Sequence, residues 1–203
     1  VRTVLRQLQA SRDGQLALDF RLSAEPAKVL QLRRRESPPL AAMLDVSARD
    51  EEPTADQYFV AASAIDDGSP DAALRAAAGY RRALEIDPYL VPALINLANI
   101  HYAQDQIPEA QALYERAIVI DGDVFEAHFN LGNIFHDLGR YREAQACYRE
   151  ALRLNPQYAE AHFYLAVTLE KGGHSHEART HWRAYQQLAP QGEWVDLARE
   201  FSD

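Results

Sequence analysis

The sequence predicts an all-α solenoid of four helix pairs, closed by a last helix and preceded by a small appendage. Three observations predict this fold. Residue types recur with a period of 34, small and large residues keep their places within that period, and turn-forming residues separate the expected helices. A period of this length is typical of repeat folds, in which each unit buries its apolar face against the next one.

The first 44 residues read as an appendage with a short helix and two strands. Apolar residues at positions 1, 4, 5 and 8 have helical spacing, and residues 16–22 alternate between apolar and polar types as a strand does. Residues 28–33 are the expected hairpin partner. Two strands alone are barely stable in water, so this piece has to dock on something. The polar residues 45–56 are the expected linker.

Turn residues set the length of the repeat. The dipeptides Asp87-Pro88 and Asn155-Pro156 lie 68 positions apart, and half that distance after the first of them lands on Asp121-Gly122. Four blocks follow from this spacing: 57–90, 91–124, 125–158 and 159–192. We number the places in each block from 1 to 34. Gly139 and Gly172-Gly173 are expected to turn the chain between paired helices.

Small and large residues recur at the same places of the blocks. Place 8 holds Ala64, Ala98, Gly132 and Ala166, place 20 holds Ala76, Ala110, Ala144 and Ala178, and place 24 holds Tyr80, Tyr114, Tyr148 and Trp182. Small residues let two helices approach closely, and large ones fill the spaces between them. The first block is the weakest, with Ser63 where the other blocks have leucine and with Asp67 at a place that holds bulky apolar residues in the last two blocks. Residues 193–203, which carry Trp194 and Phe201, are the expected closing helix.

This pattern resembles the tetratricopeptide repeat (TPR) over about two thirds of the chain. The resemblance implies a right-handed superhelix and a protein-binding adaptor that catalyses nothing. In that family, places 2, 5, 6, 9 and 12 of the first helices point into a concave groove. The implied peptide-binding residues are Ile95, Asn96, Asn99, Tyr102, Glu126, Phe129, Asn130, Asn133, His136, Phe163, Tyr164 and Glu170.

The chemistry of these residues indicates the kind of partner. An asparagine amide can pair with both groups of a peptide backbone, although asparagine at these places also forms hydrogen bonds inside the repeat. The aromatic residues at place 5 are expected to anchor apolar side chains, and the glutamates are expected to favour basic ones. Relatives that bind acidic tails need lysine and arginine at places 5 and 6, which hold apolar residues and asparagine in this sequence.

Two other functions stay open from the sequence. The stretch Gly14–Phe20 is similar to the segment that joins the halves of some MerR-like bacterial regulators, which implies the sensory half of a transcription regulator. Self-association, with the N-terminal strands of one copy filling the groove of another, would give a homo-oligomeric scaffold. An accessory repeat region of a larger enzyme is the remaining alternative.

Composition and motifs exclude further classes. Residues 54–203 hold 12 basic and 22 acidic side chains, and an acidic surface disfavours nucleic acid. No apolar stretch reaches the ~20 residues of a membrane span, and no catalytic or cofactor motif occurs. His128 and His162 are expected to pack between helices. His176 and His181, five residues apart, do not share a helix face, so no metal site is expected. The lone Cys147 indicates a cytoplasmic protein.

Overall fold

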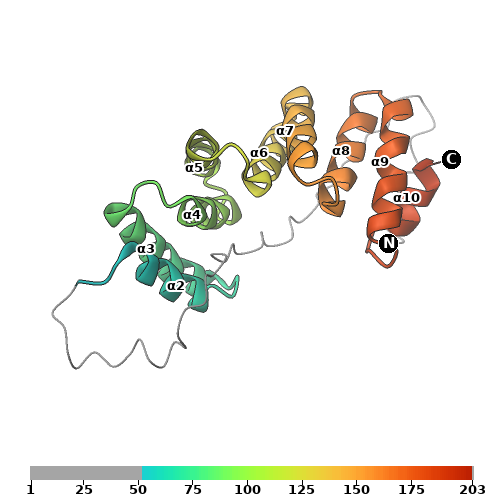
Figure 1. Ribbon diagram of the computed structural model, residues 1–203. Coiled ribbons are helices and arrows are strands. Elements are labelled where there is room, and N and C mark those ends of the chain that lie inside the picture. The colour runs from blue at the N-terminus through green and yellow to red at the C-terminus, as the bar shows by residue number, and fades with distance from the viewer. Residues whose placement is uncertain (1–51, 203) are drawn as a thin grey trace. The chain divides into compact units, whose positions relative to one another are not determined.

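The computed structural model describes residues 52–202, which are helices and short turns (Figure 1). Within this range nine helices form four pairs and a last single helix, which confirms the expected helix pairs and closing helix. The described residues divide into two compact units, 52–122 and 123–202. The expected N-terminal helix and strands lie outside the described residues, and the handedness of the superhelix stays a prediction.

The first unit consists of α2 (Ala55–Ile65), α3 (Pro70–Ile86), α4 (Val91–Ala103) and α5 (Ile107–Ile120). A capping box starts α2, because the Thr54 side chain accepts a hydrogen bond from the Gln57 N–H while the Gln57 side chain accepts one from the Thr54 N–H. The Ser69 side chain caps α3 by accepting from the Ala72 N–H, and Pro70 occupies its first turn.

The first helix pair departs from the frame of the other three. Helix α2 already begins at Ala55, inside the predicted linker, and it ends four residues earlier in its block than α4 ends in the next one. Ala64, which the sequence places against the neighbouring helix, is exposed. Ala62 is buried instead, and a Cβ added to Gly79 would lie 2.8 Å from the Ala62 Cβ. The change in register therefore moves the small contact residue by two positions, from Ala64 to Ala62.

The second unit consists of α6 (Phe125–Asp137), α7 (Tyr141–Leu154), α8 (Ala159–Lys171), α9 (Ser175–Leu188) and α10 (Val195–Ser202). Its first pair shows why the repeat needs a small residue at place 8. A Cβ on Gly132 of α6 would lie 2.6 Å from Cε1 of the Tyr148 ring on α7, and the Tyr148 side chain is fully buried. The close approach of α6 and α7 thus depends on the missing side chain at Gly132.

The turns inside the last three pairs share one backbone conformation. Place 15 holds Asp105, Gly139 and Gly173, with φ angles of 60°, 72° and 77°. In each turn the N–H of the residue after place 15 donates to a backbone carbonyl five positions earlier. The three bonds are Gln106 to His101, Arg140 to Phe135 and His174 to Leu169. This arrangement is the Schellman motif, in which a left-handed residue ends the helix. Asp105 therefore adopts the conformation that glycine favours.

The closing helix α10 and Trp194, which directly precedes it, cover the apolar face of the last pair. The Trp194 ring stacks on Phe163 of α8, with ring centroids 5.7 Å apart, and Phe201 packs 5.8 Å from the buried Trp182 of α9. Without this helix, the aromatic face of α8 and α9 would be open to water, so α10 takes the part of a capping repeat.

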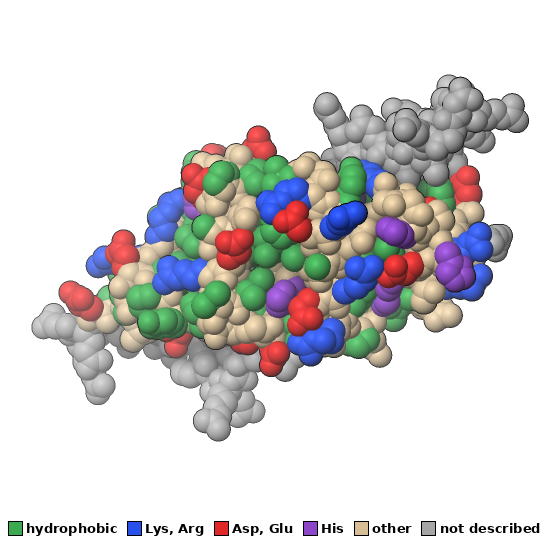
Figure 2. Space-filling view, turned by 90° about the horizontal axis from the view of Figure 1, so that it is seen from above, with side chains coloured by type: hydrophobic (Ala, Val, Ile, Leu, Met, Phe, Trp, Pro, Cys, Tyr) green, Lys and Arg blue, Asp and Glu red, His purple; other side chains and the backbone are tan. Residues whose placement is uncertain are grey.

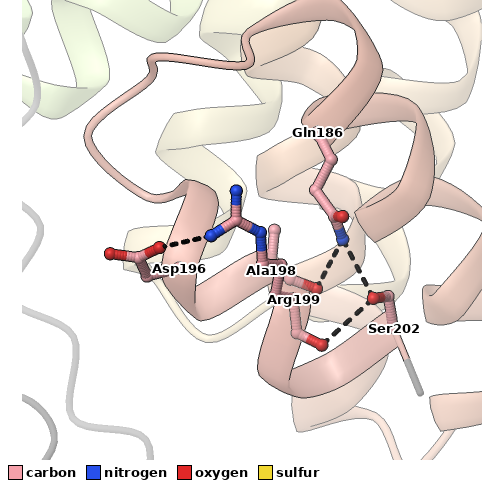
Figure 3. A network of polar contacts seen from close by, with 5 residues as sticks. All are labelled: Gln186, Asp196, Ala198, Arg199 and Ser202. Carbon is pink, nitrogen blue, oxygen red and sulfur yellow. Dashed lines mark hydrogen bonds and ion pairs between the residues drawn. The ribbon is translucent and has the colours of Figure 1, made fainter.

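Polar contacts fix α10 against α9 (Figure 3). The Gln186 amide on α9 donates to the Ala198 carbonyl and to the Ser202 hydroxyl, both at 2.9 Å. The Ser202 hydroxyl donates in turn to the Arg199 carbonyl at 3.1 Å. One side chain of α9 thereby satisfies acceptors in the last turn of α10, where helical partners are missing.

Replacing Asp105 with glycine is predicted to raise the free energy of unfolding by roughly 0.5–1 kcal/mol, because glycine adopts a positive φ without a steric penalty. Urea unfolding measures the change. Asp105→Asn serves as the control, since it removes the charge but keeps a residue that tolerates this conformation. A stabilisation by Asp105→Asn as large as that by Asp105→Gly would show that charge, and not backbone conformation, is responsible.

Candidate functional site

The predicted groove residues lie on the first helices of three pairs. Ile95, Asn96, Asn99 and Tyr102 lie on α4 in the first unit, Glu126, Phe129, Asn130, Asn133 and His136 on α6, and Phe163, Tyr164 and Glu170 on α8 in the second unit. Within the second unit the structure brings residues of α6 and α8 together, since the Tyr164 ring lies 5.6 Å from Phe129 and 6.3 Å from His136.

The place-9 asparagines bond to the place-24 tyrosines of their own pairs. The Tyr114 hydroxyl donates to Asn99 Oδ1 at 2.5 Å, and the Tyr148 hydroxyl donates to Asn133 Oδ1 at 2.9 Å. Each tyrosine comes from the second helix of the pair and crosses to the first. The bond inside the repeat, which the sequence left as one alternative, is therefore present. It also determines which way the Asn133 amide points.

Asn96 at place 6 donates a hydrogen bond to a tyrosine hydroxyl, whereas the place-9 asparagines accept one. Its amide nitrogen donates to the Tyr80 hydroxyl of the preceding pair at 3.2 Å, and that hydroxyl lies 3.2 Å from an Asp66 carboxylate oxygen. Burial raises the pKa of Tyr80 to about 12, so the phenol stays protonated and can donate. The contact joins the pair α2–α3 to α4 inside the first unit.

The place-5 residues are packed into the units. The exposed fractions of Ile95, Phe129 and Phe163 are 0%, 7% and 2%. Phe129 meets the edge of the Tyr158 ring with centroids 4.8 Å apart, and Phe163 contacts Trp182 at 5.5 Å. Such edge-to-face contacts stabilise an aromatic cluster. Binding of a ligand by these rings stays a prediction.

His136 at place 12 takes part in a buried polar network between α6 and α8. Its Nδ1 lies 2.8 Å from the Thr168 hydroxyl, which itself donates to the Tyr164 carbonyl at 2.6 Å. Lys171 Nζ lies 3.4 Å from Nε2 on the other side of the ring. Burial, followed by the positive charge of Lys171, lowers the pKa of His136 to about 4. The imidazole is therefore neutral at pH 7, with Nδ1–H donating to Thr168 and Nε2 accepting from Lys171.

Glu170 at place 12 of the last pair bonds within that pair. One carboxylate oxygen accepts from the Ser175 hydroxyl at 2.5 Å, and the other accepts from Trp182 Nε1 at 3.4 Å. The side chain is buried. Among the acidic residues of the prediction, Glu126 is half-buried and presents more surface than Glu170.

Sequence reasoning missed Thr168 and Lys171 in this site. Thr168 is fully buried, although a polar residue in the middle of α8 is unusual unless it is hydrogen-bonded. That signal was available, since place 10 holds Ile100 and Ile134 in the two preceding blocks. The contact of Lys171 with His136 spans 35 positions and follows from the packing of α8 on α6.

A metal site, a membrane-spanning helix or a basic nucleic-acid-binding surface in the described residues would indicate another function. Residues 52–202 contain no group of three or more histidine, cysteine and acidic side chains that could hold a metal ion. No helix in that range is long and apolar enough to cross a bilayer. On the face drawn in Figure 2, basic and acidic side chains are interspersed, which is unlike the basic surface of a nucleic-acid binder.

Comparison with known proteins identifies the repeat. A model of the TPR repeat matches residues 98–139 and 132–173. A search of curated proteins gives no match. The MerR-like resemblance of residues 14–20 gains no support from the family match, which falls entirely within the repeats.

Solved structures share the fold. YrrB, described as a TPR protein with an unusual peptide-binding site, has a TM-score of 0.62 and 24% identity over 73% of this chain and 74% of its own. MamA has a TM-score of 0.59 and 17% identity, over 68% of this chain and 79% of its own. The APC/C hetero-tetramer Cut9-Hcn1 has a TM-score of 0.65 and 17% identity, over 74% of this chain and 30% of its own.

Replacing Tyr148 with phenylalanine is predicted to lower the free energy of unfolding by about 0.5–1.5 kcal/mol, because the buried Asn133 oxygen loses its donor. The matched control is Tyr89→Phe, since Tyr89 is 71% exposed and should lose almost nothing. Equal effects of the two substitutions in urea unfolding would contradict a structural role for the Asn133–Tyr148 bond.

Proposed function

We propose that this chain, which is a tetratricopeptide-repeat protein, is a non-enzymatic module that binds an extended segment of another protein along the first helices of its repeats. The fold supports the proposal, because within each unit the helix pairs stack on one another in the same order of first and second helix. The similarity to YrrB, a TPR protein with a peptide-binding site, points the same way.

The observation that carries the proposal is the orientation of Asn133. Its Oδ1 accepts from Tyr148 on α7, so the carboxamide cannot rotate freely and its Nδ2 hydrogens are directed away from that bond. A peptide carbonyl is the natural acceptor for such a donor. Because the amide is already ordered, little side-chain entropy is lost when a ligand binds.

Charge indicates which segments fit. Residues 54–203 carry ten more acidic than basic side chains, and the predicted groove residue Glu126 and its counterpart Glu160 in the next block are half-buried at the same place of α6 and α8. We therefore infer that the ligand carries basic residues beside apolar ones. Complementary charge of this kind raises the association rate more than it raises the affinity.

The regulator and the self-associating scaffold stay as alternatives, and both depend on residues before 52. Light scattering of the full chain separates the scaffold from the adaptor, because only the scaffold forms oligomers without a ligand.

A displayed library of random peptides tests the proposal. Selection on the wild-type chain, with counter-selection on Asn133→Arg, should enrich extended peptides that contain basic and apolar residues. The selected peptide is then titrated against Asn133→Asp, which keeps an acceptor for Tyr148 but removes the amide donor. Its binding should weaken by about 0.5–1.5 kcal/mol, the net value of one hydrogen bond.

Controls separate binding from folding in this experiment. Arg142→Ala changes an exposed residue of the second helix α7 and should leave the affinity unchanged. Asn133→Ala should lose both affinity and stability, because it also removes the acceptor of Tyr148. Enrichment of no peptide over the counter-selected variant, or equal affinity of wild type and Asn133→Asp, would refute the proposal.

A further inference from the structure

Two histidines on neighbouring helices form a direct pair in the last repeat. His162 on α8 and His181 on α9 have their Nδ1 atoms 2.9 Å apart, with ring centroids 5.2 Å apart. Both side chains are half-buried. The sequence considered His181 together with His176, but His181 instead meets His162, which lies 19 positions away.

The hydrogen bonds determine where the protons are. His162 Nε2 lies 3.1 Å from the Pro156 carbonyl oxygen, and a carbonyl only accepts, so Nε2 carries a hydrogen. The neutral His162 ring therefore has an unprotonated Nδ1. The contact between the two Nδ1 atoms needs one hydrogen, which must come from His181. Neutral His181 is thus the Nδ1–H tautomer, and its Nε2 is the free acceptor of the pair.

This arrangement accepts one proton but not two. The first proton can bind His181 Nε2, and the Nδ1–H of His181 still donates to His162. A second proton would have to bind His162 Nδ1, where it would face the His181 N–H across 2.9 Å. Two cationic rings that point hydrogens at each other cannot stay in contact. Full protonation consequently requires the rings to separate.

The surroundings also disfavour the charged forms. Burial lowers the pKa of His162, and burial together with the neighbouring His162 lowers the pKa of His181 to about 4. Glu177, one turn before His181 on α9, acts in the other direction, whereas Arg149 on α7 adds to the decrease. Arg149 and Glu177 form an ion pair of 2.7 Å, so their effects on His181 largely offset each other.

The pair lies beside the contacts that hold the end of the chain. Phe163 follows His162 and stacks on Trp194, and Trp182 follows His181 and packs on Phe201. A change in the distance between α8 and α9 at the histidines would therefore loosen the aromatic face that α10 covers.

We propose that His162 and His181 form an acid-sensitive latch that keeps α8, α9 and α10 together at neutral pH and releases them as the pH falls. The latch does not depend on the proposed peptide binding. Histidines in the opened segment have a pKa near 6.5, above that of the closed pair, so the open state binds more protons. The closed state is fully stable above about pH 6.5. Below that pH, a histidine that is protonated in the open state but stays neutral in the closed state makes opening more favourable. Each such histidine increases the opening constant by up to about tenfold for every unit by which the pH falls.

Tryptophan fluorescence measures the opening locally, because both tryptophans of the chain, Trp182 and Trp194, lie in this region. Urea titrations of the full chain between pH 7.5 and 5 should show that the urea concentration at the midpoint decreases as the pH is lowered. Between pH 7.5 and 5 the opening constant of the wild type should increase at least about tenfold more than that of the double variant His162→Gln/His181→Gln. His176→Gln is the control and should keep the wild-type pH dependence, because His176 is an exposed histidine of the same helix as His181. A double variant with the pH dependence of the wild type would overturn the proposal.

Nitrogen-15 spectra of the wild-type histidine rings provide a test that needs no variant. They should show His162 as the Nε2–H tautomer, His181 as the Nδ1–H tautomer, and both rings titrating below pH 6.5. Ordinary titration of both rings near pH 6.5 would contradict the latch. Addition of Zn²⁺ at pH 7.5 should leave the urea midpoint unchanged. A Zn²⁺-dependent increase that the double variant lacks would identify a metal site and overturn the proton latch.

Discussion

The contact between a large ring on the second helix of a pair and a small residue on its first helix determines the rest of this structure. In the pair α6–α7 the Tyr148 ring occupies the space that a side chain at Gly132 would need. The tyrosine is fully buried there, and so are Tyr80 and Tyr114 at the same place of the first two blocks. Close approach then brings the tyrosine hydroxyl within hydrogen-bond distance of the first helix, where Asn133 accepts it. The Tyr148 side chain thus fills the space between the two helices and also provides a hydrogen-bond donor for the buried Asn133 oxygen.

The candidate site follows from this contact. An asparagine at place 9 is needed inside the repeat to accept the tyrosine hydroxyl, and the same bond gives its amide hydrogens a definite direction. Structural and ligand-binding roles of Asn133 are therefore not alternatives, because the amide has separate donor and acceptor ends. Where the last block has Trp182 in place of tyrosine, the acceptor changes as well. Glu170 at place 12 accepts from the indole nitrogen, which has no lone pair to offer and can only donate.

Much of the fold could be predicted from the sequence, because the period of 34 is carried by small and large residues whose sizes decide the packing. The helix pairs and the closing helix after Trp194 follow from such local signals. The register of α2 could not be predicted, since the small residue Ala62 lies two positions from the expected Ala64 and both are alanines. The pairing of His162 with His181 was also out of reach. It depends on the rotation of α8 against α9, and no pattern along a single helix encodes that rotation.

A double-mutant cycle on Gly132 and Tyr148 tests the central contact most directly. In the wild-type background, Gly132→Ala should lower the free energy of unfolding by about 1–3 kcal/mol, because the new methyl group overpacks against the ring. In a Tyr148→Leu background the ring is absent. The same substitution should then cost nothing, or stabilise the protein by up to ~1 kcal/mol through the higher helix propensity of alanine. An equal loss in both backgrounds would contradict the account, because the need for a small residue at place 8 would then have a cause other than Tyr148.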